Sequence, residues 1–272
     1  MDAAAGYTHP LPANPSPADE LANALTTSLE GFLCPSDSVD DQNFHRGSEG
    51  GDSPTSTVAL AGDGGAAISG TGPGSEGILV AATSNYVAAN NVQRCHGQIL
   101  TSAAFTGFST PQGAYCSFTE TSLGRMADGT SNTIVFGERV YDSFNVRDDG
   151  RPNGGALMYV TRGVGNPENY DSGITDVAAS AWGGVNLTVS TTDQTLLDDI
   201  WARRKQGLAS RHSGGVNVAR GDGSVAFMRD TISTWYQIDS PLDDIPPVLE
   251  YEALEKAFAV ADGLPAEDLS GS

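Results

Sequence analysis

The stretch Arg211–Asp230, RHSGGVNVARGDGSVAFMRD, decides most of what the sequence predicts about the fold. Its two halves alternate apolar and polar residues, and the pair Asp222-Gly223 lies between them. An Asp-Gly pair between two alternating runs is typical of a β-hairpin with a tight turn. The alternation predicts that four apolar side chains share one face of this hairpin: Val216, Val218, Val225 and Phe227.

Two polar residues of this stretch have both a structural and a functional interpretation. Nine residues separate His212 from Asp222. An aspartate at a tight turn accepts hydrogen bonds from nearby backbone N–H groups, which is the structural interpretation of Asp222; a ligand or catalytic carboxylate is the alternative. For His212 we favour a structural histidine that hydrogen-bonds the hairpin backbone. A direct pair between His212 and Asp222 across the hairpin is a further hypothesis.

The 272-residue chain is strongly acidic, with a formal net charge of −20 and two lysines, Lys205 and Lys256. Such a chain repels phosphate backbones, so we predict no nucleic-acid partner and no binding to an anionic membrane surface. The carboxylates have two interpretations, a solvated surface or ligands of a divalent cation such as calcium. The 33 glycines and the modest aromatic content favour a β-rich fold with many turns.

The sequence divides into a flexible Pro-rich lead, one globular domain and an acidic tail, at 1–18, 19–238 and 239–272. Helical spacing of apolar residues predicts short helices at 19–32 and 195–206. A long irregular Gly/Ser loop is expected at 38–77. The tail is expected to hold a short helix within 248–261, which either packs on the domain or stays apart from it.

No run of 18 apolar residues occurs, so the sequence predicts no membrane-spanning segment. The N-terminal residues are polar and Pro-rich, without the basic and apolar regions of a signal peptide. We therefore expect no export signal and no prepilin leader within this chain.

The cysteines and histidines suggest no familiar metal site. Three cysteines without CxxC spacing make a zinc knuckle improbable. In an exported protein Cys95 and Cys116 could form a disulfide, and Cys34 would then stay unpaired or pair with another chain. Three ordinary buried thiols are the alternative. The histidines lie far apart, at positions 9, 45, 96 and 212, so we predict no zinc site and assign no metal ligand.

No catalytic motif is present either. No GxSxG sequence surrounds any serine. Ser213 follows His212 directly, but adjacent side chains of an extended strand point to opposite faces. We predict no catalytic residue, and a hydrolase built from residues distant in sequence remains an alternative.

Four sequence boxes, taken in order, resemble one family. They are Phe32–Asp37 (FLCPSD), Ser84–Val87 (SNYV), Asp128–Ile134 (DGTSNTI) with Gly137-Glu138, and His212–Gly223 (H-x9-DG). In order and spacing these boxes are similar to a large planctomycete family of prepilin-like secreted proteins, catalogued as a domain of unknown function. The resemblance covers roughly 28–238. Its signature residues are Cys34, Asp128, Gly129, His212, Asp222 and Gly223.

The resemblance implies a pilin-like globular head, an α+β fold with a β-rich antiparallel sheet and short flanking helices. It further implies an extracellular or cell-envelope location, with other pilin-like subunits or secretion and envelope components as partners. It supplies no catalytic residue, and similarity to type II secretion pseudopilins makes a structural calcium ion conceivable. A surface module that binds carbohydrate or calcium is the alternative. The expected core comprises Phe32, Leu33, Tyr86, Val87, Ile134, Val135, Phe136, Trp201, Val216, Val218, Val225 and Phe227.

Overall fold

A computed structural model of the chain describes fourteen stretches: 29–37, 58–60, 67–68, 71–72, 75–76, 83–92, 113–115, 121–140, 156–157, 161–163, 177–187, 203, 206–236 and 252–260. The predicted disulfide between Cys95 and Cys116 and the Pro-rich lead at 1–18 lie outside the described residues. So do most of the helices predicted at 19–32 and 195–206.

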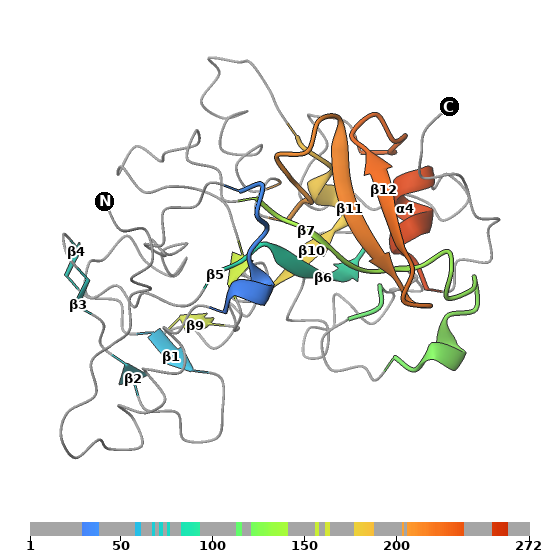
Figure 1. The fold of residues 1–272 in the computed structure, drawn as a ribbon. Coiled ribbons are helices and arrows are strands. Elements are labelled where there is room, and N and C mark those ends of the chain that lie inside the picture. The colour runs from blue at the N-terminus through green and yellow to red at the C-terminus, as the bar shows by residue number, and fades with distance from the viewer. Residues whose placement is uncertain are drawn as a thin grey trace.

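A five-stranded sheet with the order β10-β6-β7-β11-β12 forms the centre of the described structure (Figure 1). Its strands are β10 (Ala178–Ser180), β6 (Tyr86–Asn91), β7 (Ile134–Glu138), β11 (Gly215–Arg220) and β12 (Val225–Arg229). Three neighbouring pairs are antiparallel, as predicted, but β10 runs parallel to β6. The sheet is therefore mixed. After β7 the chain returns to the edge beyond β6, so β10 runs opposite to β7 and hence parallel to β6.

The predicted hairpin is confirmed as β11 and β12, but its turn differs from the predicted one. Arg220 N–H donates to the Ser224 carbonyl, and Gly223 N–H donates to the Arg220 carbonyl. Three residues, Gly221 to Gly223, therefore form the loop in place of a two-residue turn. Gly223 has a φ of +83°, the left-handed position that a three-residue hairpin loop requires.

The longer loop shifts the pairing of the two strands by one residue. Val216 lies opposite Met228 and Val218 opposite Ala226, so Phe227 lies opposite Asn217. A one-residue shift moves every side chain of a strand to the other face. Phe227 and Val225 thus lie on the open face of the sheet and not beside Val216 and Val218, which corrects the prediction.

The two faces of the sheet differ in what covers them. One face belongs to the main core, where Val87, Ile134, Val216 and Val218 are buried, as predicted. Four residues expected in the core are instead exposed on the other face, Tyr86, Phe136, Val225 and Phe227, and Phe32, which lies outside the sheet, is exposed as well. Leu33 and Val135 are partly buried, and Trp201 lies outside the described residues.

The helix predicted in the acidic tail packs on the core face. Helix α4 (Ala253–Phe258) buries Leu254 and Phe258 in the main core (Figure 1). A capping box joins Glu252 and Glu255 at its first turn. Burial raises the pKa of Glu255, although Thr234 Oγ1 at 2.6 Å and the Trp235 N–H donate hydrogen bonds to its carboxylate. Of the two alternatives for the tail helix, the structure therefore shows the one in which the helix packs on the domain.

Short elements surround the central sheet. The loop predicted at 38–77 is not wholly irregular, because it holds β1 (Val58–Leu60), β2 (Ala67–Ile68), β3 (Thr71–Gly72) and β4 (Ser75–Glu76). Strand β1 pairs with β2 and with β9 (Thr161–Gly163), while β5 (Thr83–Ser84) pairs with β8 (Ala156–Leu157). The short 3-10 turns are η1 (Glu30–Phe32), η3 (Leu123–Arg125) and η4 (Ala181–Gly183). Among the residues that the structure describes, no helix combines the length and apolar composition that crossing a bilayer requires.

Candidate functional site

The Cys34–Asp37 segment is fastened to the sheet by one asparagine. Asn85 Oδ1 accepts a hydrogen bond from the Cys34 N–H at 2.8 Å, and its Nδ2 donates to Asp37 Oδ2 at 2.6 Å. The same Nδ2 donates to the Arg139 carbonyl at 3.2 Å. The Asp37 N–H closes a turn onto the Cys34 carbonyl. Asn85 is buried, so these hydrogen bonds hold the first box against the second in a place that water does not reach.

Three chemically reactive side chains converge beside this segment. The Cys34 Sγ lies 4.0 Å from His212 Nε2, and Glu138 Oε1 lies 3.2 Å from the same nitrogen. One ligand atom from each residue lies within 4.8 Å of the other two. The three residues belong to three different sequence boxes, and the two contacts of His212 span 178 and 74 residues of chain.

Glu138 bonds to β11 through its side chain, because its backbone carbonyl no longer pairs with that strand. The Glu138 carbonyl accepts a hydrogen bond from the Ala209 N–H. Its carboxylate bonds to Asn217 of β11. Oε2 accepts from the Asn217 backbone N–H at 2.7 Å, and Oε1 accepts from Asn217 Nδ2 at 3.1 Å. The carboxylate is 5% exposed, so its position is fixed by these donors and not by solvent.

His212 is positioned by the turn that enters β11. Its N–H donates to Ser210 Oγ at 3.0 Å, and Ser210 Oγ donates to the Gly215 carbonyl at 2.7 Å. Gly214 has a φ of +81°, which lets the chain reverse into the strand. The imidazole keeps 30% of its surface exposed, and it is therefore the side of the cluster that solvent reaches.

Tyr86 borders the cluster from the neighbouring strand. It lies opposite Glu138 in the β6–β7 register, on the open face. Burial raises the pKa of Tyr86, and the negative charges of Cys34 and Glu138 raise it further. The phenol therefore stays protonated and faces an acidic neighbourhood.

The remaining signature residues meet at the far end of β11. The Gly221 N–H donates to the Thr133 carbonyl and the Asp222 N–H to the Thr130 carbonyl. Gly129, at a φ of +97°, shapes the loop that presents these carbonyls. Hydrogen bonds from Ser224, side chain first and then backbone, and from Ser131 hold the pKa of Asp222 below its ordinary value. These contacts agree with the turn interpretation of Asp222.

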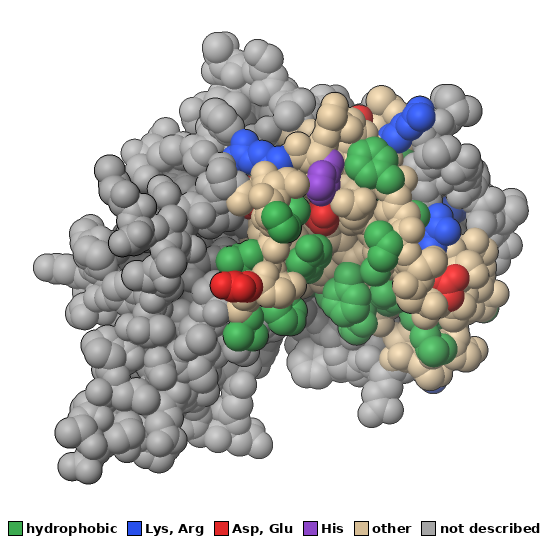
Figure 2. Space-filling view, viewed as in Figure 1, with side chains coloured by type: hydrophobic (Ala, Val, Ile, Leu, Met, Phe, Trp, Pro, Cys, Tyr) green, Lys and Arg blue, Asp and Glu red, His purple; other side chains and the backbone are tan. Residues whose placement is uncertain are grey.

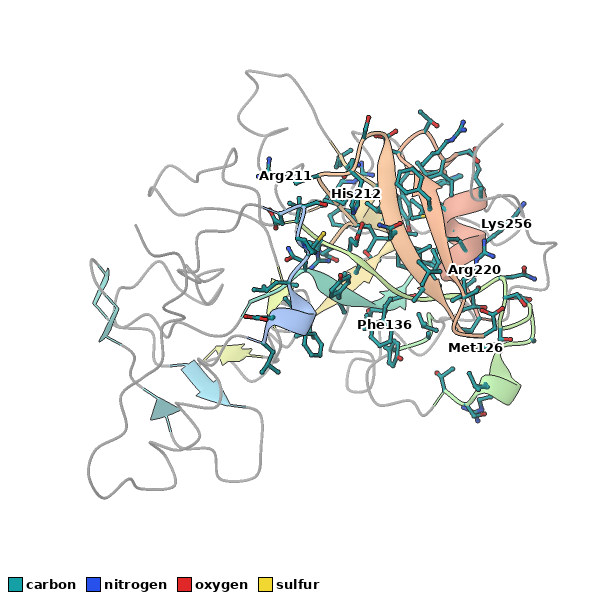
Figure 3. The ribbon with its side chains drawn as sticks, in the orientation of Figure 1. Met126, Phe136, Arg211, His212, Arg220 and Lys256 are labelled. Atoms are coloured by element: carbon teal, nitrogen blue, oxygen red, sulfur yellow. The ribbon has the colours of Figure 1, made fainter. Side chains whose placement is uncertain are left out.

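The hypothesis of a His212–Asp222 pair is wrong. Asp222 bonds to Ser224 in its own turn, and His212 bonds to Glu138 at the opposite end of the strand. Figure 3 shows the separation, with His212 and Arg211 at the start of β11 and Arg220 and Met126 by the turn. The nine intervening residues are mainly the strand itself.

The ring geometry does not match a catalytic relay. In a nucleophile–histidine–carboxylate relay, the nucleophile and the carboxylate use opposite ring nitrogens. Here both Cys34 and Glu138 approach Nε2. Calcium fits no better, because it takes oxygen ligands and this group offers a single carboxylate. A sulfur, a nitrogen and an oxygen around a common point is instead a donor set that transition metals accept.

The sequence prediction named Cys34 and His212 but missed three residues that define the site. Glu138 was quoted only as part of a box, and Asn85 and Asn217 were not singled out. The signal that could have found them is the order of the boxes, since each box supplies one member of the site. Asp128 and Gly129, by contrast, belong to the turn end.

The open sheet face beside the cluster is apolar. Tyr86, Phe136, Val225 and Phe227 are exposed along β6, β7 and β12. Tyr115 packs against Phe136 with ring centroids 5.1 Å apart and ring planes tilted by 41°. In Figure 2 this green patch lies next to the purple histidine and its red carboxylate neighbour. The described surface thus places a polar cluster at the margin of an aromatic face.

Comparison with known proteins gives a family and no function. No curated protein and no solved structure matches the chain. A family model described as a protein of unknown function (DUF1559) matches residues 3–234. This range contains all four boxes and both ends of β11. The chain therefore belongs to the DUF1559 family of proteins of unknown function.

Proposed function

We propose that this chain is the globular head of a pilin- or pseudopilin-like subunit of the cell envelope or of extracellular filaments, with a structural and non-enzymatic role. The observation that supports this most strongly is the attachment of 29–37 to the sheet. Asn85 binds both Cys34 and Asp37, so one buried side chain fastens the N-terminal segment to the head. A pilin-like subunit needs such a rigid junction between its N-terminal part and its head.

Several polar side chains of the boxes support the same role because they bond to the protein's own backbone. Asn85 satisfies the Cys34 N–H and the Arg139 carbonyl, and Glu138 satisfies the Asn217 N–H. Asp222 satisfies the Ser224 N–H. Side chains used in this way stabilise the fold.

The open aromatic face supports contact with neighbouring subunits. Exposed aromatic side chains are enriched at the centres of protein interfaces. A chain with a net charge of −20 repels its own copies at long range, so a subunit contact needs an apolar surface of this kind. Val225 is 71% exposed and Phe227 42%, and neither side chain serves the core.

Source cells provide the test of location and assembly. Native protein would be recovered from envelope and sheared-surface fractions, and its N-terminus read by intact mass and sequencing. We expect an apolar helix cut from a basic leader ahead of the head, and cross-links to other pilin-like subunits. Recovery from the cytosol alone, with no such helix, would overturn the proposal.

A paired variant tests the surface. Val225→Lys with Phe227→Lys should abolish those cross-links while the circular dichroism spectrum stays that of the parent. Asp222→Asn, at the exposed turn and away from the aromatic face, is the matched control and should cross-link like the parent. Unchanged cross-linking by the double lysine variant would remove this face from the assembly.

A further inference from the structure

We propose that Cys34, Glu138 and His212 form a binding site for a divalent transition-metal ion of the zinc class, with one coordination position left to solvent. The proposal does not depend on pilin-like assembly. It rests on three ligand atoms that all lie within 4.8 Å of one another. The Cys34 sulfur and a Glu138 oxygen both approach the third atom, Nε2 of His212. No other such group occurs among the residues that the structure describes.

Two of the three distances between the donor atoms lie near those around a tetrahedral ion. Zinc lies about 2.3 Å from sulfur and about 2.0–2.2 Å from nitrogen or oxygen, which places neighbouring donor atoms about 3.4–3.6 Å apart. The nitrogen–oxygen distance of 3.2 Å and the nitrogen–sulfur distance of 4.0 Å bracket that range. The sulfur and the carboxylate oxygen lie within 4.8 Å of each other, so they would approach by about 1.2 Å or less to complete the geometry.

Neighbouring groups hold the carboxylate of one ligand and the backbones of the other two. Asn217 holds both oxygens of Glu138, and Ser210 fixes the backbone of His212. Asn85 fixes the backbone of Cys34. Such outer contacts raise metal affinity, because the donors need not be ordered when the ion binds.

The chemical types of the three donor atoms indicate which class of metal ion binds. A thiolate and an imidazole favour zinc, cobalt and other transition ions, whereas calcium and magnesium prefer oxygen. A metal ion binds a thiolate and a ring nitrogen that carries no proton, so protons compete with the ion and the affinity should fall as the pH is lowered.

The fourth position is open on the side of the imidazole. His212 keeps 30% of its side-chain surface exposed, while Glu138 is 5% exposed. Three protein ligands with one open position distinguish exchangeable or catalytic zinc sites from closed structural ones. Water, or a donor from a bound partner, would complete the coordination.

Cobalt provides the optical test on the full-length, metal-free protein. Titration with Co²⁺ should produce thiolate-to-cobalt charge-transfer absorption and the intense visible bands of a tetrahedral ion, and Zn²⁺ should remove both. Cys34→Ser should abolish the charge-transfer band, and Glu138→Gln should weaken Co²⁺ binding about tenfold or more. Asn217→Ala, which removes only the orienting amide, should weaken it about tenfold.

Asp222→Asn, at the other end of β11, is the control and should bind like the parent. Octahedral, weak cobalt spectra that are the same in the parent and in Cys34→Ser would overturn the site.

A second measurement uses the unaltered protein, so it decides the matter even if the variants fail to fold. Zn²⁺ should slow alkylation of Cys34 about tenfold or more, as expected for a ligating thiolate. Equal alkylation of Cys34 with and without Zn²⁺ would also overturn it.

Discussion

The two ends of β11 differ in the kind of atom that makes their contacts. At the turn end, Gly221 and Asp222 are held by carbonyls of the Thr130–Thr133 segment, so the backbone does most of the work. At the other end, the side chains of Cys34, Glu138 and His212 meet. One signature therefore joins a structural turn to a chemically reactive cluster. The strand length sets the spacing between them, and the spacing alone does not indicate that the two ends act together.

The largest expected effect tests whether the reactive end also supports the fold. Glu138→Ala should lower the free energy of unfolding by about 2–3 kcal/mol, because the half-buried Asn217 N–H loses its charged acceptor. Urea denaturation measures this loss. Glu138→Gln keeps an acceptor oxygen and should lose less than half as much. Equal stability of the alanine variant and the parent would mean that the cluster contributes nothing to folding.

The next effect sharpens the comparison by detaching one segment. Asn85→Ala removes the side chain that binds Cys34, Asp37 and Arg139, and should cost about 2 kcal/mol. Hydrogen exchange should accelerate in 30–37 and stay unchanged at the β11–β12 turn. Asn132→Ala is the matched control at the turn end, where the exposed amide makes one hydrogen bond to the Asp128 carbonyl. If exchange accelerates equally at both ends, the two regions unfold as one unit.

A smaller effect isolates the turn. Gly223→Val should destabilise the protein by about 1–2 kcal/mol, because a β-branched residue resists a φ of +83°. No atom lies within 4 Å of the position that a Cβ would take, so the cost comes from the backbone alone. Gly223→Asn should recover much of the loss, since asparagine tolerates this conformation. Cobalt binding should be the same in both variants, and a changed affinity would show that the two ends are coupled.

The smallest effect is a pH dependence at the exposed Asp222. Its pKa is lowered in the folded protein, so its stabilising contribution is present above the ordinary value of 3.8 and is lost as the pH falls through the folded value. The difference in stability between the parent and Asp222→Asn should therefore be largest near neutral pH and vanish in acid. Thermal melting across that range measures it. A difference that is independent of pH would assign the effect to the amide substitution itself.

The sequence could predict the elements that depend on local pattern. Alternation and an Asp-Gly pair revealed the β11–β12 hairpin. It could not predict which way β12 faces, because that depends on one residue of loop length. It missed β10, whose Ala-Ala-Ser sequence has no strand pattern of its own.

The candidate site was beyond local patterns for a different reason. Cys34 and His212 lie 178 residues apart, so metal-ligand spacing along the chain says nothing about them. Their contact depends on Asn85, whose hydrogen bond to the Cys34 N–H belongs to the folded chain only. The order of the boxes was the one available sign of this meeting, and it indicates neighbours without giving their geometry.

The three-residue loop of the hairpin has a consequence for how this surface can change. Removing one residue from Gly221–Gly223 would alter no side chain of β12, yet it would turn the strand inside out. Phe227 and Val225 would enter the core, and the fully buried Met228 would face solvent. The aromatic face is thus encoded by a chain length and not only by the residues that compose it. A deletion in this loop would therefore change the surface of the protein without changing the sequence of β12, because the outward and inward side chains of the strand exchange places.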